Sequence, residues 1–122
     1  MTNVKLRVTH MPQVGTRCPA FHIPVTSVAE AKLVMDTIAA YDLFQLQHHI
    51  KPDFASCSCL EVWNPETQEW DGWEFETPEG IEPYEYFDDV DEYCARYHPE
   101  LQASHDELFA QIDIDAIRKE FG

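Results

Sequence analysis

The sequence predicts an α+β fold: a mainly antiparallel sheet of four to five strands, one helix packed on a face of that sheet, and an acidic helical C-terminal part. Short segments that alternate apolar and polar residues flank one long segment with helical periodicity. The length of 122 residues suits one domain, and the apolar fraction of 44% is that of a globular protein. We therefore expect a single domain, with residues 1–83 as a sheet module and residues 84–122 as a helical acidic extension.

The first two strands are expected at residues 4–10 and 21–25. Both segments place apolar residues at every second position, which is the pattern of a strand with one buried face. Pro24 lacks a backbone N–H donor, so the second of these strands should lie at an edge of the sheet.

A helix is expected from Ser27 to about Tyr41. Ser27 and Glu30 have the spacing of a capping box, in which two side chains satisfy backbone N–H groups of the first turn. Apolar residues then recur at helical spacing and should pack against the sheet: Ala31, Val34, Met35, Ile38 and Tyr41. Residues 43–49 are interpreted as the next strand, although the apolar residues that open this segment are also compatible with a longer helix.

A hairpin carrying tryptophans is expected next. Residues 57–63 alternate as a strand, residues 64–67 form a turn, and residues 68–75 return. This pairing would bring Trp63 near Trp70 or Trp73, where an aromatic pair contributes up to about 1 kcal/mol.

The last third of the chain is expected to be helical. A helix is predicted from about Tyr84 to His98, because acidic residues in its first turns favour the positive end of the helix dipole and Pro99 stops it. Ser104 and Glu107 form a second capping box, which predicts one or two final helices.

The net charge of −15 is divided very unevenly along the chain. Residues 1–60 sum to +1, whereas residues 61–122 carry nineteen acids and three bases and sum to −16. Nucleic acid and anionic membranes are disfavoured as direct ligands, because a protein that binds them needs Lys and Arg to neutralise phosphates. The favoured partner is a basic protein surface, with a cation or solvent alone as the alternatives.

An acidic and aromatic run at residues 71–92, DGWEFETPEGIEPYEYFDDVDE, carries the main functional prediction. It contains ten carboxylates and no Lys or Arg. Carboxylates along one strand are about 7–10 Å apart, so this run alone is too sparse to imitate duplex DNA, which has about one charge per 1.7 Å. Several elements would have to combine, and the simpler interpretation is a solvated acidic face with aromatic residues packed beneath it. The predicted partner-binding residues are Asp71, Trp73, Glu74, Glu76, Glu79, Glu82, Tyr84, Glu85, Tyr86, Phe87, Asp88, Asp89, Asp91 and Glu92.

Metal binding and catalysis find little support. Cys57 and Cys59 lack the second ligand pair of a structural zinc site, and small buried cysteines explain them better. The acids at residues 88–92 lack the glycine and the spacing of a calcium loop. No hydrolase, phosphate-binding or dinucleotide-binding motif occurs, so we expect no enzyme, no catalytic residues, no cofactor and no metal.

The location in the cell is expected to be cytoplasmic. The start of the chain lacks the basic and apolar regions of a signal peptide, and no apolar run is long enough to span a membrane. Reduced cysteines are then the default.

The middle of the chain resembles small uncharacterised proteins encoded by bacteriophages, prophages and plasmids. The resemblance covers about residues 21–82 and rests on VTSVAEAKLVMDTIAAYDLFQLQHHIKPDF, followed by LEVWN, EW and DGWE. Its features are an A-K helix, a Y-D-L-F corner, a K-P-D-F turn and a hairpin with tryptophans. The resemblance implies a mobile-element accessory protein and transfers no catalytic residue. Small acidic proteins of that origin often block host or defence machinery, including restriction and CRISPR effectors, by occupying nucleic-acid sites.

The leading functional hypothesis is therefore a non-enzymatic phage inhibitor. Its acidic face would occupy the basic nucleic-acid site of a host or defence protein, as anti-CRISPR or anti-restriction proteins do. The second hypothesis is a sponge that sequesters a nucleotide defence signal, with Arg7, Arg17 and Lys51 as phosphate ligands. A third is a structural phage protein or a homodimer whose acidic face keeps it soluble.

Overall fold

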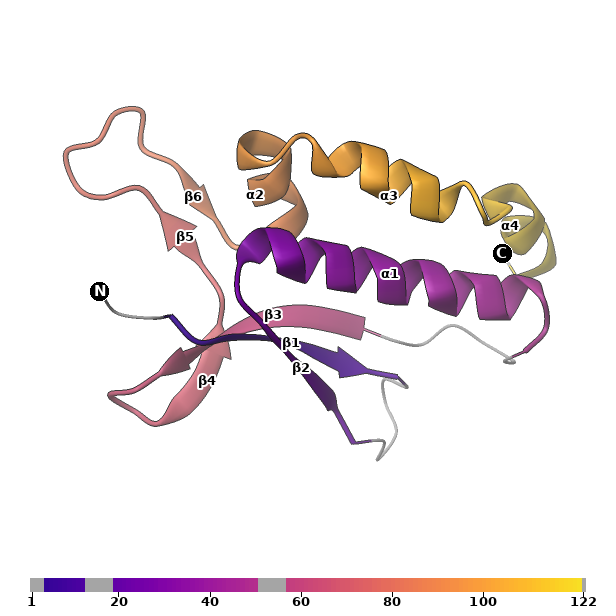
Figure 1. Ribbon diagram of the computed structural model, residues 1–122, viewed down its shortest axis with the longest axis horizontal. Coiled ribbons are helices and arrows are strands. Elements are labelled where there is room, and N and C mark those ends of the chain that lie inside the picture. The colour runs from indigo at the N-terminus through magenta and orange to yellow at the C-terminus, as the bar shows by residue number, and fades with distance from the viewer. Residues whose placement is uncertain (1–3, 13–18, 51–56, 122) are drawn as a thin grey trace.

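The computed structural model describes residues 4–12, 19–50 and 57–121, and the account below concerns these residues. Figure 1 shows a sheet, one long helix lying across it, and further helices on the far side of that helix. The elements in chain order are β1 (Leu6–Met11), β2 (Phe21–Val25), α1 (Val28–Gln47), β3 (Cys57–Asn64), β4 (Glu69–Gly72), β5 (Phe75–Glu76), β6 (Tyr86–Phe87), α2 (Val90–Tyr97), α3 (Leu101–Phe109) and α4 (Ile114–Phe121). The predicted α+β class is confirmed.

The main sheet has four strands in the order β2-β1-β3-β4, and all neighbours are antiparallel. Val8 at its centre lies opposite Ile23 on one side and Leu60 on the other. The predicted edge position of the strand with Pro24 is confirmed. The predicted return strand at residues 68–75 is interrupted after Gly72, and its last part pairs with Tyr86–Phe87 in a separate two-stranded sheet.

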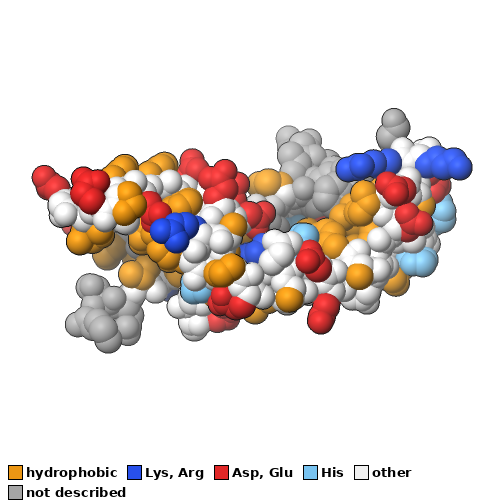
Figure 2. Space-filling view, turned by 90° about the horizontal axis from the view of Figure 1, so that it is seen from above, with side chains coloured by type: hydrophobic (Ala, Val, Ile, Leu, Met, Phe, Trp, Pro, Cys, Tyr) orange, Lys and Arg blue, Asp and Glu red, His pale blue; other side chains and the backbone are white. Residues whose placement is uncertain are grey.

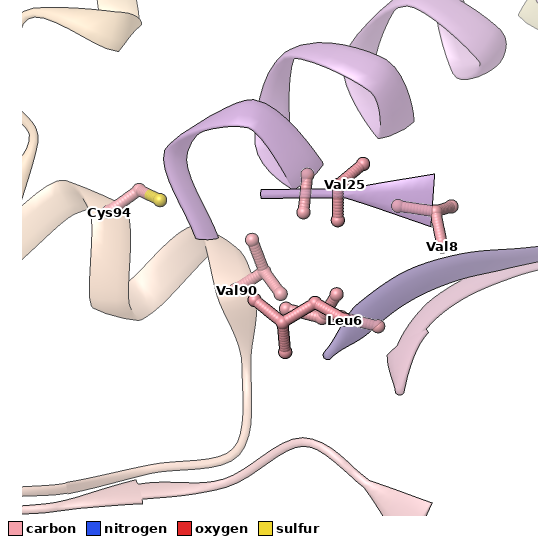
Figure 3. Packing of buried hydrophobic residues seen from close by; sticks show 7 residues of the cluster. Leu6, Val8, Val25, Val90 and Cys94 are labelled. Carbon is pink, nitrogen blue, oxygen red and sulfur yellow. The ribbon is translucent and has the colours of Figure 1, made fainter. Parts of the chain in front are cut away.

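The main core joins the sheet to α1 and α2. Its buried members are Leu6, Val8, Val25, Ala31, Leu60, Val90 and Cys94. Figure 3 shows these side chains converging between β1, β2 and the start of α2. Val8 and Cys94 are completely buried. Because α2 contributes to the same core as the sheet, the segment leading into α2 has a fixed position relative to the sheet.

Helix α1 is longer than the sequence predicted. The expected start is confirmed, since the Ser27 side chain accepts a hydrogen bond from the Glu30 backbone N–H. The expected strand at residues 43–49 is wrong, because α1 continues through most of it. Leu46 is buried against Ala40 and α4 in a second core cluster, and this packing holds the segment in the helix. The helix ends where His49 adopts a positive φ of 57°.

Helix α1 is a middle layer between the sheet and helices α2 to α4 (Figure 1). One side of α1 packs on the sheet, and other residues pack on the helices, so α1 lacks one distinct apolar face. Lys32 is buried in the helical layer, where its Nζ lies 3.0 Å from carboxylate oxygens of both Asp36 and Asp91. Tyr41, expected to face the sheet, is instead 58% exposed.

Two further boundaries in the C-terminal part differ from the predictions. The helix expected from Tyr84 begins at Val90, because Tyr86 and Phe87 pair with β5 as a strand and Asp89 caps the helix. Ser104, expected as a cap, lies inside α3. The Leu101 backbone N–H donates to the His98 carbonyl, so the chain turns from α2 into α3 several residues earlier than the Ser104 motif indicates. The predicted end of α2 before Pro99 is confirmed.

Candidate functional site

The predicted partner-binding run forms an arm beside α2. We use the term acidic arm for residues 73–89, which comprise β5, β6 and the loop between them. The arm extends from the sheet at the upper left of Figure 1. Phe75 pairs with Phe87, and the Thr77 backbone N–H donates to the Glu85 carbonyl at 2.9 Å. These contacts hold the two sides of the loop together.

A cluster of aromatic rings attaches the acidic arm to α2. Its members are Trp73, Phe75, Phe87, Tyr93 and Tyr97. Tyr93 lies at its centre, with ring centroids 5.2 Å from Trp73 and 5.0 Å from Phe75, both in edge-to-face geometry. Trp73 and Phe87, which the sequence suggested as partner anchors, are half-buried in this cluster. In contrast, Tyr84 and Tyr86 are 59% and 45% exposed.

Nine of the ten carboxylates of the run are exposed, and Glu85 is the half-buried one. Glu85 accepts hydrogen bonds from Arg96 Nε, at 2.9 Å, and from the Tyr97 hydroxyl. Three of the exposed carboxylates also have a structural role. Asp91 pairs with Lys32, Asp89 accepts from the first backbone N–H groups of α2, and Asp71 accepts from Asn64.

The remaining carboxylates form the accessible part of the acidic surface. Among the described residues no Lys, Arg or His is within ion-pairing distance of this group, which consists of Glu74, Glu76, Glu79, Glu82, Asp88 and Glu92. The Tyr84 hydroxyl donates to Glu76 at 3.0 Å, and this hydrogen bond raises the pKa of Tyr84. Partial desolvation and a hydrogen bond to Glu74 raise the pKa of Tyr86. Both tyrosines thus stay neutral donors beside the carboxylates.

An acidic cleft of about 1080 Å³ lies between α1 and the strands β3 and β4, where the arm begins. Its apolar lining residues include Met35, Leu60, Val62 and Trp73. Five carboxylate residues also line it: Asp71, Glu74, Asp88, Asp89 and Asp91. A long basic side chain fits this chemistry, because its aliphatic part can pack against the apolar lining residues while its charge reaches the carboxylates. Figure 2 shows acidic side chains continuing from the arm across the helical face.

The cysteines do not form a metal site within the described residues, where no group of three or more His, Cys, Asp or Glu side chains could hold an ion. The expectation that Cys57 and Cys59 are buried is wrong, because both are exposed. Cys94 is buried, and desolvation raises its pKa to about 11. A thiol with this pKa is a poor nucleophile near neutral pH.

The outer face of the sheet carries a cluster that the sequence analysis did not identify. The Arg7 guanidinium lies 4.1 Å from the centre of the Trp70 ring, and its Nε donates to Glu61 at 2.8 Å. Trp63 and Trp70 pack edge to face at 5.4 Å, which confirms the predicted cross-strand pair. Arg7 was a candidate phosphate ligand, but these contacts already engage it. Arg17 and Lys51, the other two candidates, lie outside the described residues.

A polar chain at the end of the sheet also escaped the sequence analysis, because its members are far apart in sequence. His10 Nδ1 lies 2.6 Å from Ser58 Oγ, and His10 Nε2 lies 3.8 Å from an Asp42 carboxylate oxygen. The distance between His10 Nε2 and the Asp42 oxygen is too long for a hydrogen bond, whereas the members of a catalytic triad are joined by hydrogen bonds. These contacts link β1, β3 and α1, and we assign them to the fold.

The fold and its surface define a small acidic α+β protein with an exposed carboxylate arm. A family model described as superinfection exclusion gene product 17 matches residues 5–99, and the chain belongs to this family. The match includes the acidic arm and α2. It confirms the resemblance to small phage accessory proteins and agrees with the expectation of a non-enzymatic protein.

A curated relative has a related name. The chain is 41% identical over 61 residues to the superinfection exclusion protein of Salmonella phage P22, and the match covers 50% of this chain and 57% of the relative. The chain thus spans little more than half of that protein's length. No solved structure matches the chain. Among the described residues, no helix has the length and apolar character needed to cross a membrane.

Proposed function

We propose that this phage accessory protein limits the growth of a second infecting phage by binding a basic protein surface through its acidic arm. The target would be a nucleic-acid-binding protein, and the arm would occupy the groove that normally holds phosphates. The observation that carries the proposal is the exposure of nine of the ten carboxylates between Asp71 and Glu92, held by an ordered arm and an aromatic cluster.

The arrangement of the acidic arm supports binding to a protein in particular. Exposed carboxylates come from β5, from the loop that joins β5 to β6, from the residues after β6 and from the first turn of α2, so several elements contribute to one surface. The exposed Tyr84 and Tyr86 lie among them and supply the aromatic contacts common at interfaces. The acidic cleft would receive one Arg or Lys of the target. Long-range attraction would accelerate association, and the aromatic contacts would slow dissociation.

The proposed activity can be tested in cells. Salmonella cells that produce the chain are challenged with a panel of phages, and plating efficiency is compared with that of cells carrying an empty vector. We expect reduced plating for at least one phage. A variant with Glu74, Glu79, Glu82 and Asp88 changed to Lys should restore plating, because these carboxylates are exposed and lack a described cation partner.

A matched control separates the acidic arm from net charge. The control variant changes Glu100, Asp106, Glu107 and Asp115 to Lys, which reverses the same number of exposed carboxylates within or next to α3 and α4. It should retain the activity of the natural sequence. If both variants lose activity equally, total charge rather than the arm is responsible. If the arm variant stays fully active while folded, the arm is not the binding surface.

A binding assay tests the mechanism. The purified chain is used to capture proteins from the host lysate, with washes at about 50 and about 300 mM salt. Screening weakens attraction between exposed charges, so the retained target should be lost at the higher concentration. The captured protein should bind nucleic acid, and the chain should displace that nucleic acid. If nucleic acid stays bound to the target at a saturating concentration of the purified chain, the proposed binding site is wrong.

A further inference from the structure

The two short strands of the acidic arm have an inward and an outward face. Phe75 and Phe87 pair across the strands and contact Tyr93 and Tyr97 of α2, so they mark the inward face. Every second residue of an extended segment faces the same way, so the residues between and beside them face away from α2. These residues are all exposed, and we call them the outward face: Glu74, Glu76, Tyr84, Tyr86 and Asp88.

The outward face places two tyrosine rings beside two carboxylates, with one carboxylate for each ring. The Tyr84 hydroxyl donates to Glu76 at 3.0 Å, and the Tyr86 hydroxyl donates to Glu74. Because each hydrogen bond is made at the hydroxyl, it fixes the ring without covering its face. Within the described residues, neither of these two rings packs against another aromatic ring, whereas Phe75 and Phe87 pack against several. The outward rings are therefore held in place but not used in the packing of the cluster.

A row of rings beside a row of carboxylates has the layout of a single nucleic-acid strand, in which each base accompanies one phosphate. A protein that binds a single strand offers cations to the phosphates and aromatic side chains on which the bases stack. A duplex offers no free base faces, because its bases are held inside the stack. Its phosphates are also much closer together than carboxylates on a strand. The outward face thus matches a single-strand site in both rings and charge, whereas a duplex site matches the charge alone.

We propose that the outward face of the acidic arm imitates a single nucleic-acid strand, and that the target is a protein with a groove for single-stranded nucleic acid. This inference rests on the proposed function and narrows the class of its target. Glu74 and Glu76 contact cations of the groove in place of phosphates, and no described Lys, Arg or His pairs with either of them. Tyr84 and Tyr86 stack on aromatic side chains of the groove in place of bases.

A competition experiment tests the class of target. The protein captured from the host lysate is purified and bound to the immobilised natural chain. It is then released with single strands of thymidine or of uridine about twenty nucleotides long, which exceeds the site of one single-strand-binding fold. The comparison is a duplex with the same number of phosphates. We expect one of the single strands to release the target at a concentration at least about tenfold lower than the duplex, because only a single strand also competes for the aromatic side chains.

Three variants separate the rings from the charge. Tyr84→Ala removes one ring and keeps every carboxylate, and it should weaken binding to the target by about tenfold, as the loss of one stacked ring does. Tyr84→Phe keeps the ring and should bind as the natural chain does. The control, Tyr41→Ala, removes a tyrosine of α1 that is 58% exposed, against 59% for Tyr84, and should leave binding unchanged. Circular dichroism establishes that each variant is folded.

The charge-reversed arm variant described above distinguishes this inference from the proposed function. If charge reversal abolishes binding but Tyr84→Ala binds like the natural chain, the proposed function stands and the imitation of a single strand is overturned. Equal loss in Tyr84→Ala and Tyr84→Phe, or release by the duplex at the same concentration as the single strands, also overturns it. If charge reversal leaves binding intact, or if the natural chain retains no protein from the lysate, the proposed function and this inference both fail.

Discussion

At the scale of single residues, Glu61 shows how the outer face of the sheet is held together. Its side chain accepts hydrogen bonds from Arg7 on β1 and from Thr9 on the same strand. Partial burial acts to raise the pKa of Glu61, but the hydrogen bonds from Thr9 and Arg7 outweigh burial and hold the pKa below its ordinary value. The charged form of Glu61 therefore links β3 to β1.

This shift predicts a pH-dependent contribution to stability. A carboxyl with a lowered pKa in the folded state stabilises the protein above its unfolded pKa, and this contribution is lost as the pH falls through the folded pKa. Glu61→Gln should therefore reduce the free energy of unfolding at pH 7 by about 1.5–3 kcal/mol, the usual range for hydrogen bonds to a charged group. Below about pH 4, near the ordinary pKa of Glu, the difference from the natural chain should shrink. Urea unfolding at both pH values measures it.

The control for Glu61 is Glu66→Gln, in the exposed turn between β3 and β4. At each of the two pH values, this variant should have the same free energy of unfolding as the natural chain. A Glu61→Gln penalty that does not shrink as the pH is lowered below the ordinary pKa of Glu would contradict the electrostatic origin, since the contribution of a lowered pKa is lost as the pH falls through the folded pKa.

At the scale of elements, the aromatic cluster decides how firmly the acidic arm is held. Phe87 contacts Phe75 across the two short strands and Tyr93 and Tyr97 on α2. Two strands of two residues each supply few backbone hydrogen bonds. The position of the arm therefore depends on ring packing more than on strand pairing.

Replacing Phe87 by Ala should loosen the arm. The lost ring contacts should cost about 2 kcal/mol, below the value for a completely buried Phe because Phe87 is half-buried. Backbone amides of residues 74–87 should exchange with solvent faster, as measured by hydrogen–deuterium exchange with mass spectrometry. The comparison variant Tyr84→Phe removes one exposed hydrogen bond, to Glu76, and should leave exchange unchanged. Unchanged exchange in Phe87→Ala would mean that other contacts hold the arm.

Elements with local signals were predictable from the sequence, and elements defined by distant contacts were not. The alternation in β1 to β3, the Ser27 cap and the Trp63–Trp70 pair depend on neighbouring residues, and all are confirmed. The end of α1 depends on Leu46 packing against α4, more than sixty residues away in sequence. Similarly, β6 forms because Phe87 meets Phe75 and α2, whereas its acidic neighbours locally favour a helix start.

The composition of the candidate site was predictable, whereas its organisation was not. The run at residues 71–92 stands out in charge, and the structure places nine of its carboxylates at the surface. The sequence could not show that Trp73 and Phe87 belong to the aromatic cluster that attaches the arm to α2. An aromatic residue in the sequence is compatible both with packing inside the protein and with contacting a partner. Nor could it indicate the apolar groove between β2 and α1, which is lined by residues that are distant in sequence.

At the scale of the whole molecule, the concentrated negative charge should oppose folding. Like charges held close in the compact state repel each other, and salt screens this repulsion. Raising sodium chloride from about 10 to about 300 mM should therefore raise the melting temperature. A gain of about 1 kcal/mol corresponds to about 4 °C for a domain of this size. Differential scanning calorimetry gives the melting temperature directly.

A variant with less repulsion provides the comparison for salt. Changing Glu79, Glu82 and Glu92 to Gln removes three exposed carboxylates that have no described cation partner. Its melting temperature should be higher than that of the natural chain at low salt and should respond less to added salt. A melting temperature that falls with salt would show that ion pairs such as Arg7–Glu61 outweigh the repulsion.

The middle position of α1 limits where relatives of this chain can diverge. Most of the helix surface is committed to the sheet or to the other helices, so substitutions there must preserve volume or an ion pair. One strip is exposed to solvent instead: Leu33, Thr37, Tyr41 and Phe44. Leu33, Thr37 and Tyr41 of this strip line the groove beside β2. Substitutions in the strip can therefore alter the surface of this groove at little cost to folding, so we expect sequence differences along α1 to concentrate there.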